Sequence, residues 1–226
     1  MIRAVVFDLW NTLARSPGGN PFQRARALLR PDQLGAFADF QRDGMTRAYP
    51  DREAFLAAWR DRLNLDPGQE AALAQAFAAG EAEAELFPEA PEALAGTRAL
   101  ARLALLSNTQ SFDLALIERL GLAEAIRVRG LSAELGAAKP EPEAFEALAR
   151  RLGLFPGNLV MVGDSWSDDV EGALAAGWTA IWINRHGRSR PEHDPEAELV
   201  ELPDLRQVPE VIERLQAGYR CSTCLG

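Results

Sequence analysis

The sequence predicts an α/β protein with a parallel sheet and an all-helical insert near its N-terminus. From residue 87 onward, short apolar runs typical of strands alternate with helical segments, an order that builds a parallel sheet from right-handed βαβ units. Residues 21–86, in contrast, carry only helical signals. The 226 residues, 47% hydrophobic and 25% charged, suffice for one globular core and a smaller second domain.

The first strand is expected at Ala4–Phe7, a run that is apolar at every position and therefore typical of a strand buried on both faces. It ends at Asp8, a carboxylate that loses hydration in such a place and so indicates a function. Ligands bind at the carboxyl ends of strands in open α/β sheets. Asp8 is therefore the first candidate for chemistry, with a polar turn over residues 11–13.

Residues 21–86 are expected to form helices and no strand. Asp32, Asp51 and Asp66 can each cap a helix, and a proline directly after Asp66 fits the first helical position. The block is a candidate lid over the end of the first strand.

Strands and helices alternate in the rest of the chain. The expected strands are Leu103–Leu106, Ile126–Val128, Leu159–Val162 and Thr179–Ile183. One helix is expected to begin at Pro91, and three others are expected at Phe112–Leu120, Pro140–Leu152 and Asp168–Ala176. Gly121 and Gly177 are the expected stop signals.

Three expected strands end in polar side chains, namely Asp8, Ser107 and Asp164, and further polar residues such as Thr12 and Asn108 follow. The carboxyl ends of parallel strands share one edge of a sheet, so these groups can converge there. One such residue would be weak evidence, because loops are polar anyway. Three together are better evidence for a site.

Lys139 is the only lysine among 24 basic residues. Codon bias explains why lysine is rare, but not why this one remains. An ammonium is a compact point charge, whereas a guanidinium is a planar fork. A tight site that holds one positive charge against carboxylates and a phosphoryl oxygen would therefore favour lysine.

Asp8, Asp164 and either Asp168 or Asp169 would bring several carboxylates together. At ~4 Å, each like-charged pair costs about 4 kcal/mol at an effective dielectric constant of 20. One lysine does not neutralise them, which leaves a raised pKa or a bound divalent cation. A donor set of oxygens alone suits Mg²⁺. Alternatively, Asp168 only caps the following helix and Asp169 faces water.

Four segments resemble, in order, the motifs of the haloacid dehalogenase-like hydrolases: FDLWNTL, LLSNTQ, ELGAAKPEPEAF and VMVGDSWSDDVEGALAAG. The resemblance covers the whole chain. It implies a Rossmann-like core of three layers around a parallel sheet, formed by residues 1–15 and 88–220, and an all-α cap domain at residues 16–87. Residues 221–226 are left as a tail.

The resemblance also implies roles. Asp8 would be a nucleophile that forms a covalent aspartyl intermediate, Thr12 and Ser107 would bind the transferred group, and Lys139 would hold Asp8 and the substrate anion. Substrate-binding positions would be Trp10, Asn11 and Asn108. Ligands for Mg²⁺ would be Asp8, the backbone carbonyl of Trp10, Asp164 and Asp169, which is the fifth residue after Asp164 and fits the last acidic position better than Asp168.

The chain departs from the phosphatases of this family at Trp10, where they usually carry a second Asp that protonates the leaving group and then activates water. Tryptophan has no proton to exchange, so general acid–base help of roughly 10²–10⁴-fold is missing. Trp10 is either a hydrophobic lid or a surface for stacking a flat substrate. Asn11 replaces the usual glycine, and asparagine tolerates a left-handed backbone.

Three functions follow from this departure. The non-acidic Trp10 favours a 2-haloacid dehalogenase, because halide leaves without a proton. The acids around Asp164 favour a Mg²⁺-dependent phosphatase that acts through an aspartyl-phosphate on a small soluble metabolite. Such an enzyme would be weak or restricted to substrates with good leaving groups. Electrostatics outweighs one substitution, so the phosphatase is preferred. A catalytically weakened, phosphate-binding regulatory protein is the third possibility, against which Asp8, Lys139 and Asp164 argue.

The net charge of −9 argues against nucleic acid and anionic membranes as partners. No apolar run is long enough to span a bilayer, and no signal peptide is expected, so the expected location is the cytoplasm. Cys221 and Cys224 could form half of a zinc site or a redox pair, but a loose tail is the simpler interpretation. The basic turn at residues 185–190 has no evident role.

Overall fold

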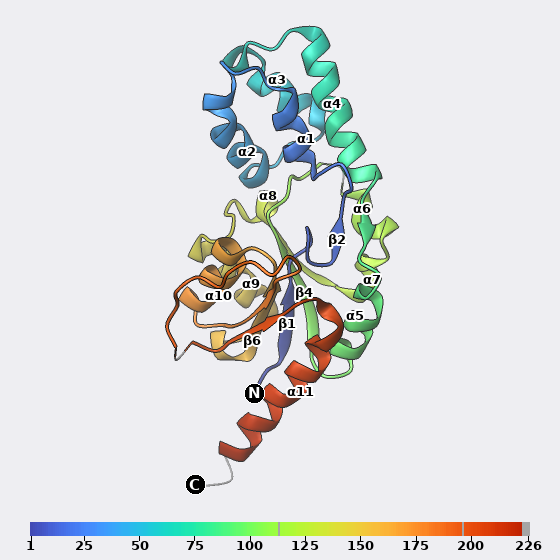
Figure 1. The fold of residues 1–226 in the computed structure, drawn as a ribbon. Coiled ribbons are helices and arrows are strands. Elements are labelled where there is room, and N and C mark those ends of the chain that lie inside the picture. The colour runs from blue at the N-terminus through green and yellow to red at the C-terminus, as the bar shows by residue number, and fades with distance from the viewer. Residues whose placement is uncertain (113, 196, 223–226) are drawn as a thin grey trace.

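The computed structural model describes residues 1–112, 114–195 and 197–222. Its centre is a six-stranded sheet in the order β5-β4-β1-β6-β7-β8, and every neighbouring pair is parallel (Figure 1). The strands are β1 (Ala4–Phe7), β4 (Arg102–Ser107), β5 (Val128–Leu131), β6 (Leu159–Gly163), β7 (Thr179–Ile183) and β8 (Leu199–Leu202). The predicted α/β fold with a parallel sheet is confirmed.

Helices cover both faces of this sheet and produce three layers. Alternate residues of β1 face opposite ways: Val5 and Phe7 pack into one apolar cluster and Ala4 and Val6 into the other. The first cluster is covered by α5 (Ala90–Arg98), α6 (Ala115–Arg119), α7 (Leu122–Ala125), a 3₁₀ turn (Leu205–Gln207) and α11 (Val208–Ser222). The second is covered by α9 (Pro142–Leu152), a π-helical turn (Trp166–Glu171) and α10 (Gly172–Ala175).

Residues 16–84, between the short strands β2 (Ala14–Arg15) and β3 (Glu85–Leu86), form a helical insert that stands beyond one end of the sheet (Figure 1). Its helices are α1 (Pro21–Leu28), α2 (Phe37–Thr46), α3 (Arg52–Leu63) and α4 (Pro67–Ala82), with a 3₁₀ turn at Leu34–Ala36. The strands β2 and β3 pair antiparallel and connect it to the core. Among the described residues, no helix has the length and apolar character needed to cross a bilayer.

The insert has its own aromatic cluster, in which Phe22, Phe40, Phe55 and Phe77 pack against one another. Phe112, which follows β4 in the core, enters this cluster and stacks on Phe55 with ring centroids 5.6 Å apart. One aromatic side chain of the core thus anchors the insert above the carboxyl ends of the strands.

The capping predictions for the insert are confirmed at Asp51 and Asp66, whose side chains accept hydrogen bonds from the backbone N–H groups of Ala54 and Gln69. The prediction at Asp32 is wrong, because α2 begins at Phe37 without a side-chain cap and Asp32 lies 3.5 Å from Arg30 in an exposed ion pair.

Other differences concern short elements. The strand expected at Ile126–Val128 lies at Val128–Leu131, because a helical turn (α7) occupies the residues just before it. Strand β3 was not expected in the helical block, and the edge strand β8 was missed. A further short helix, α8 (Ser132–Leu135), and a 3₁₀ turn at Pro156–Asn158 complete the fold. Helix α11 continues to Ser222, and Cys224 lies outside the described residues.

Candidate active site

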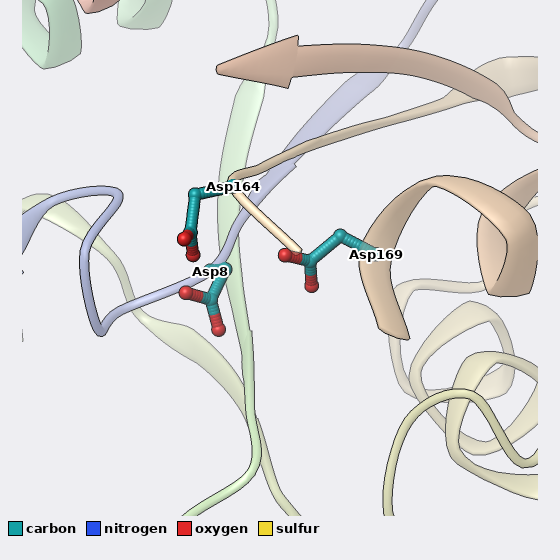
Figure 2. Close-up of side chains that lie close together, drawn as sticks. All are labelled: Asp8, Asp164 and Asp169. Atoms are coloured by element: carbon teal, nitrogen blue, oxygen red, sulfur yellow. The ribbon is translucent and has the colours of Figure 1, made fainter. Parts of the chain in front are cut away.

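Three carboxylates meet at the carboxyl ends of β1 and β6 (Figure 2). Asp8 directly follows β1, Asp164 directly follows β6, and Asp169 lies on the π-helical turn after β6. One oxygen of each carboxylate lies within 4.8 Å of the others. The structure therefore brings together the acids that the sequence predicted to converge.

Lys139 lies among these carboxylates and is itself buried. Its Nζ donates hydrogen bonds to Oδ1 of Asp8 at 2.7 Å and to Oδ1 of Asp169 at 2.5 Å. The backbone of Lys139 is held by Asn108: Oδ1 of Asn108 accepts from the Lys139 N–H, and Nδ2 donates to the Lys139 carbonyl, both at 2.8 Å. The Asn108 amide thus positions the lysine backbone, and Asn108 also lines the cavity described below.

The charges of this cluster act on one another. Burial opposes ionisation of Lys139, but the charges of Asp169 and Asp8 outweigh it and raise the lysine pKa above its ordinary value. Burial raises the pKa of Asp8 to about 8; the Lys139 charge opposes this, and the charges of Asp169 and Asp164 add to it. Burial and the charge of Asp169 raise the pKa of Asp164 to about 6. The cluster is short of positive charge, as the sequence predicted.

The backbone around β6 is shaped to bring Asp169 close. Oδ2 of Asp169 accepts a hydrogen bond from the Ser165 N–H at 3.0 Å, while Oδ1 accepts from Lys139. A Cβ on Gly163 would come within 2.2 Å of Asp169 Cγ, so only glycine fits at this position. Asp169 therefore orients both the lysine and the loop after β6.

Asp168 does not cap the helix that follows. Ser165 is the N-cap residue, and its side chain accepts from the Asp168 N–H, so the helical turn begins at Trp166 and not at Asp168. The Asp168 carboxylate instead accepts from the Ser167 hydroxyl at 3.2 Å and lines the pocket. The capping interpretation of Asp168 is wrong.

The turn after β1 has the backbone that its sequence predicted. Asn11 has a φ of 60°, in the left-handed region that asparagine tolerates. The N–H groups of Leu13 and Ala14 both donate to the Leu9 carbonyl. These bonds close the turn, in which Thr12 is fully buried.

The hydroxyls of Thr12 and Ser107 are buried and have no hydrogen-bond partner among the residues that the structure describes. A buried hydroxyl without a partner costs about 1–3 kcal/mol. Ser107 ends β4 and Thr12 lies in the turn after β1, and neither is among the residues that line the cavity described below. Two unpartnered buried hydroxyls near the carboxyl ends of these strands need an explanation, and a bound ligand is one.

A cavity of about 270 Å³ opens above the carboxylates. Trp10 lines it while packing partly against the core, and Asn11 lies beside it. The insert supplies Asn20, Gln41 and Met45, and the segment after β7 supplies Arg188. None of these four residues was predicted from the sequence, because no motif or local pattern marks them and only tertiary packing brings them to the cavity.

Asp164 is held at the cavity by two donors to its backbone carbonyl, Trp182 Nε1 at 3.0 Å and Arg188 Nη2 at 2.6 Å. The same guanidinium lies 3.8 Å from Asp164 Oδ2. The carboxylate therefore faces the cavity from a fixed peptide.

These residues fit a Mg²⁺ ion. The donor set consists of carboxylate oxygens, which Mg²⁺ prefers, and no nitrogen or sulfur ligand lies among them. The Lys139 hydrogen bonds fall on Oδ1 of Asp8 and Asp169, which leaves Oδ2 of Asp8 for a metal or a substrate.

A buried aspartate at the end of the first strand, paired with a lysine under a helical insert, is an arrangement suited to a hydrolase with an α/β fold. The chain matches the haloacid dehalogenase-like hydrolase family over residues 2–177 and belongs to that family. The fold and the enzyme class predicted from the sequence are thereby confirmed.

Known relatives act on different substrates. The chain is 30% identical to pyrimidine 5'-nucleotidase YjjG of Escherichia coli over 76% of its length and 74% of the relative's. It is 37% identical to phosphoserine phosphatase of Thermus thermophilus over 67% of its length and 64% of the relative's. The crystal structure of a 2-haloacid dehalogenase from Pseudomonas syringae is similar with a TM-score of 0.68 at 28% identity, covering 95% of this chain and 100% of that one.

Proposed function

We propose that the protein is a Mg²⁺-dependent phosphatase that acts on a small phosphorylated metabolite through an aspartyl-phosphate at Asp8. The observation that carries this proposal is the excess of carboxylates over positive charge. Lys139 bonds to two of the three clustered aspartates, and the Arg188 guanidinium lies 3.8 Å from the third, Asp164, so three carboxylates face two cations. A divalent cation removes that imbalance. A halide-releasing site would have no use for a cation there.

In the first half-reaction, Oδ2 of Asp8 attacks phosphorus, the bond to the leaving oxygen breaks, and the leaving group departs with the electron pair. Lys139 favours the ionised form of Asp8 against the effect of burial and orients it through its hydrogen bond to Oδ1. The unpartnered hydroxyls of Thr12 and Ser107 would donate to the phosphoryl oxygens. In the second half-reaction, water attacks phosphorus, the bond between phosphorus and Oδ2 of Asp8 breaks, and orthophosphate leaves carrying the protons of the water.

The metal would be held by Asp8, Asp164 and the Trp10 carbonyl, with Asp169 beside them. When bound, Mg²⁺ supplies positive charge that shields the attacking carboxylate from the phosphoryl oxygens. Asp169 already accepts from Lys139 and from the Ser165 N–H, so its main part is to orient the lysine.

Trp10 restricts the leaving groups. Its indole cannot protonate a departing alkoxide. We therefore expect the enzyme to prefer acyl and aryl phosphates, whose leaving groups are stable as anions. The helical insert, proposed as a cap domain at residues 16–87, would set the remaining specificity through the neutral side chains of Gln41 and Met45.

A 2-haloacid dehalogenase is the second candidate. Trp10 favours it, because halide needs no proton, and the similarity to a solved 2-haloacid dehalogenase agrees. The convergence of Asp8, Asp164 and Asp169 argues against it, because in that reaction no cation would balance the three carboxylates. A regulatory protein without turnover is a weaker candidate, because Asp8, Lys139 and Asp164 form an intact cluster.

A single assay series separates these functions. Hydrolysis of acetyl phosphate, p-nitrophenyl phosphate and L-2-chloropropionate is measured with Mg²⁺ and with EDTA, using Asp8→Asn as the matched inactive control. We expect phosphate release that EDTA abolishes and that Asp8→Asn lacks. Metal-independent chloride release would establish the dehalogenase instead, and no turnover of any substrate would favour the regulatory protein.

A further inference from the structure

The guanidinium of Arg185, two residues beyond β7, contacts two other segments of the chain. Nε donates to the Asn11 carbonyl at 3.2 Å, and Nη2 donates to the Thr12 carbonyl at 3.0 Å. Nη1 donates to Glu89 Oε1 at 2.6 Å, and the guanidinium lies 3.5 Å from the ring centroid of Phe87. Phe87 and Glu89 are on the segment through which the chain leaves the helical insert.

Two of these hydrogen bonds fix the backbone around Thr12. The Asn11 and Thr12 carbonyls belong to the two peptide planes that flank the Thr12 Cα. Holding both planes restricts φ and ψ of Thr12 and so the direction of its side chain. The Thr12 hydroxyl has no described partner of its own, so its position depends on the two hydrogen bonds that Arg185 donates to the backbone.

The ion pair of Arg185 with Glu89 is largely buried. The side chains of Arg185 and Glu89 are 15% and 10% exposed, so their ion pair is little screened by water. The Phe87 N–H also donates to the Leu13 carbonyl at 3.0 Å, which joins the exit of the insert to the same turn. A planar fork can serve a carboxylate, two carbonyls and a ring face at once, whereas an ammonium cannot reproduce that geometry.

We propose that Arg185 is a positioning residue that holds Thr12 for the phosphoryl group and ties the catalytic turn to the exit of the helical insert. The inference rests on the phosphatase function proposed above. It assigns a role to the basic turn after β7, because Arg185 acts through Thr12 without lining the cavity.

The test is a double-mutant cycle between Arg185→Lys and Thr12→Val, with kcat and KM measured on p-nitrophenyl phosphate and Mg²⁺. Arg185→Lys keeps the charge and should lower kcat/KM about 10- to 100-fold, as expected for a residue that orients a catalytic group. In the Thr12→Val background the same change should cost less than about threefold, because the group being positioned is already gone. Arg190→Lys, whose guanidinium contacts His193 on the surface, is the control and should have wild-type kinetics.

The same factor for Arg185→Lys in both backgrounds would show a general structural role and overturn the proposal. If Arg185→Lys fails to fold, the double variant Arg185→Met/Glu89→Gln removes both buried charges together and enters the same cycle. Hydrogen–deuterium exchange is the readout that needs no turnover: exchange of the amides of residues 9–14 should rise in Arg185→Lys and not in Arg190→Lys. If the wild type hydrolyses no phosphate ester, the proposed function fails, and exchange alone decides whether Arg185 holds the turn.

Discussion

The unpartnered hydroxyl of Thr12 predicts a conflict between stability and function. Thr12 is 0% exposed, and its Oγ1 has no described partner, so the folded protein bears the cost of desolvating this hydroxyl. Valine has nearly the same shape and no hydroxyl. Thr12→Val should therefore raise the free energy of unfolding by about 1–2 kcal/mol. For a chain of this size, each kcal/mol corresponds to an increase of ~2–4 °C in Tm.

The same substitution should impair catalysis. A hydrogen bond to a charged group contributes about 1.5–3 kcal/mol, which corresponds to a fall of roughly 10- to 150-fold in kcat/KM. Orthophosphate with Mg²⁺ should raise the Tm of the wild type, because a ligand that binds only the folded state stabilises it. We expect this increase to be smaller in Thr12→Val.

Thermal and urea unfolding, with and without orthophosphate, measure both effects. Thr97→Val is the matched control: Thr97 is also 0% exposed, but its hydroxyl donates to the Ala93 carbonyl at 2.7 Å. Removing that paired hydroxyl should lower the free energy of unfolding by about 0.5–1.5 kcal/mol. The reasoning is refuted if Thr12→Val destabilises the protein as Thr97→Val does and leaves the effect of orthophosphate unchanged.

Three further predictions concern the charged groups. Lys139→Met should abolish hydrolysis and lower the free energy of unfolding by about 3–5 kcal/mol, because two buried carboxylates lose their cation; urea unfolding showing wild-type stability would contradict this. Asp164→Asn should weaken Mg²⁺ binding in calorimetric titrations at least tenfold, and an unchanged affinity would remove Asp164 from the metal site. Burial opposes ionisation of Glu89, but the hydrogen bond from Arg185 outweighs it and lowers the pKa of Glu89 below 4.5. Since the pKa of Glu89 is lower in the folded state, its charged form stabilises the fold above about pH 4.5, and this stabilisation is lost as the pH falls. Glu89→Gln should therefore lower the Tm at pH 7 and lower it less at pH 3. An equal Tm difference at both pH values would contradict the prediction.

Local sequence was enough to predict the strands that carry the site. Ala4–Phe7 is apolar at every position because both of its faces are covered, and that burial is visible in the chain itself. Asp8 and Asp164 stand out because each ends such a run. Asp32 was misjudged because capping also requires the following residues to turn into a helix at once, and they form a separate 3₁₀ turn first.

Strand β8 illustrates what local pattern misses. Its four residues lie at the edge of the sheet, and all but Leu202 are at least partly exposed, so they carry no run of buried positions. Its pairing with β7 is decided by the neighbouring strand and not by its own composition.

The sequence by itself determined the α/β class, the helical insert, and the acids and lysine of the site. Each of these features is recognised from the residues immediately around it in the chain. Only the tertiary structure decided that Gln41 and Met45 line the same cavity as Asp8, that Phe112 packs into the aromatic cluster of the insert, and that Arg185 donates to the carbonyls around Thr12. The physical reason is that periodicity records whether a residue is buried, whereas its partner across the chain is selected by how whole elements pack.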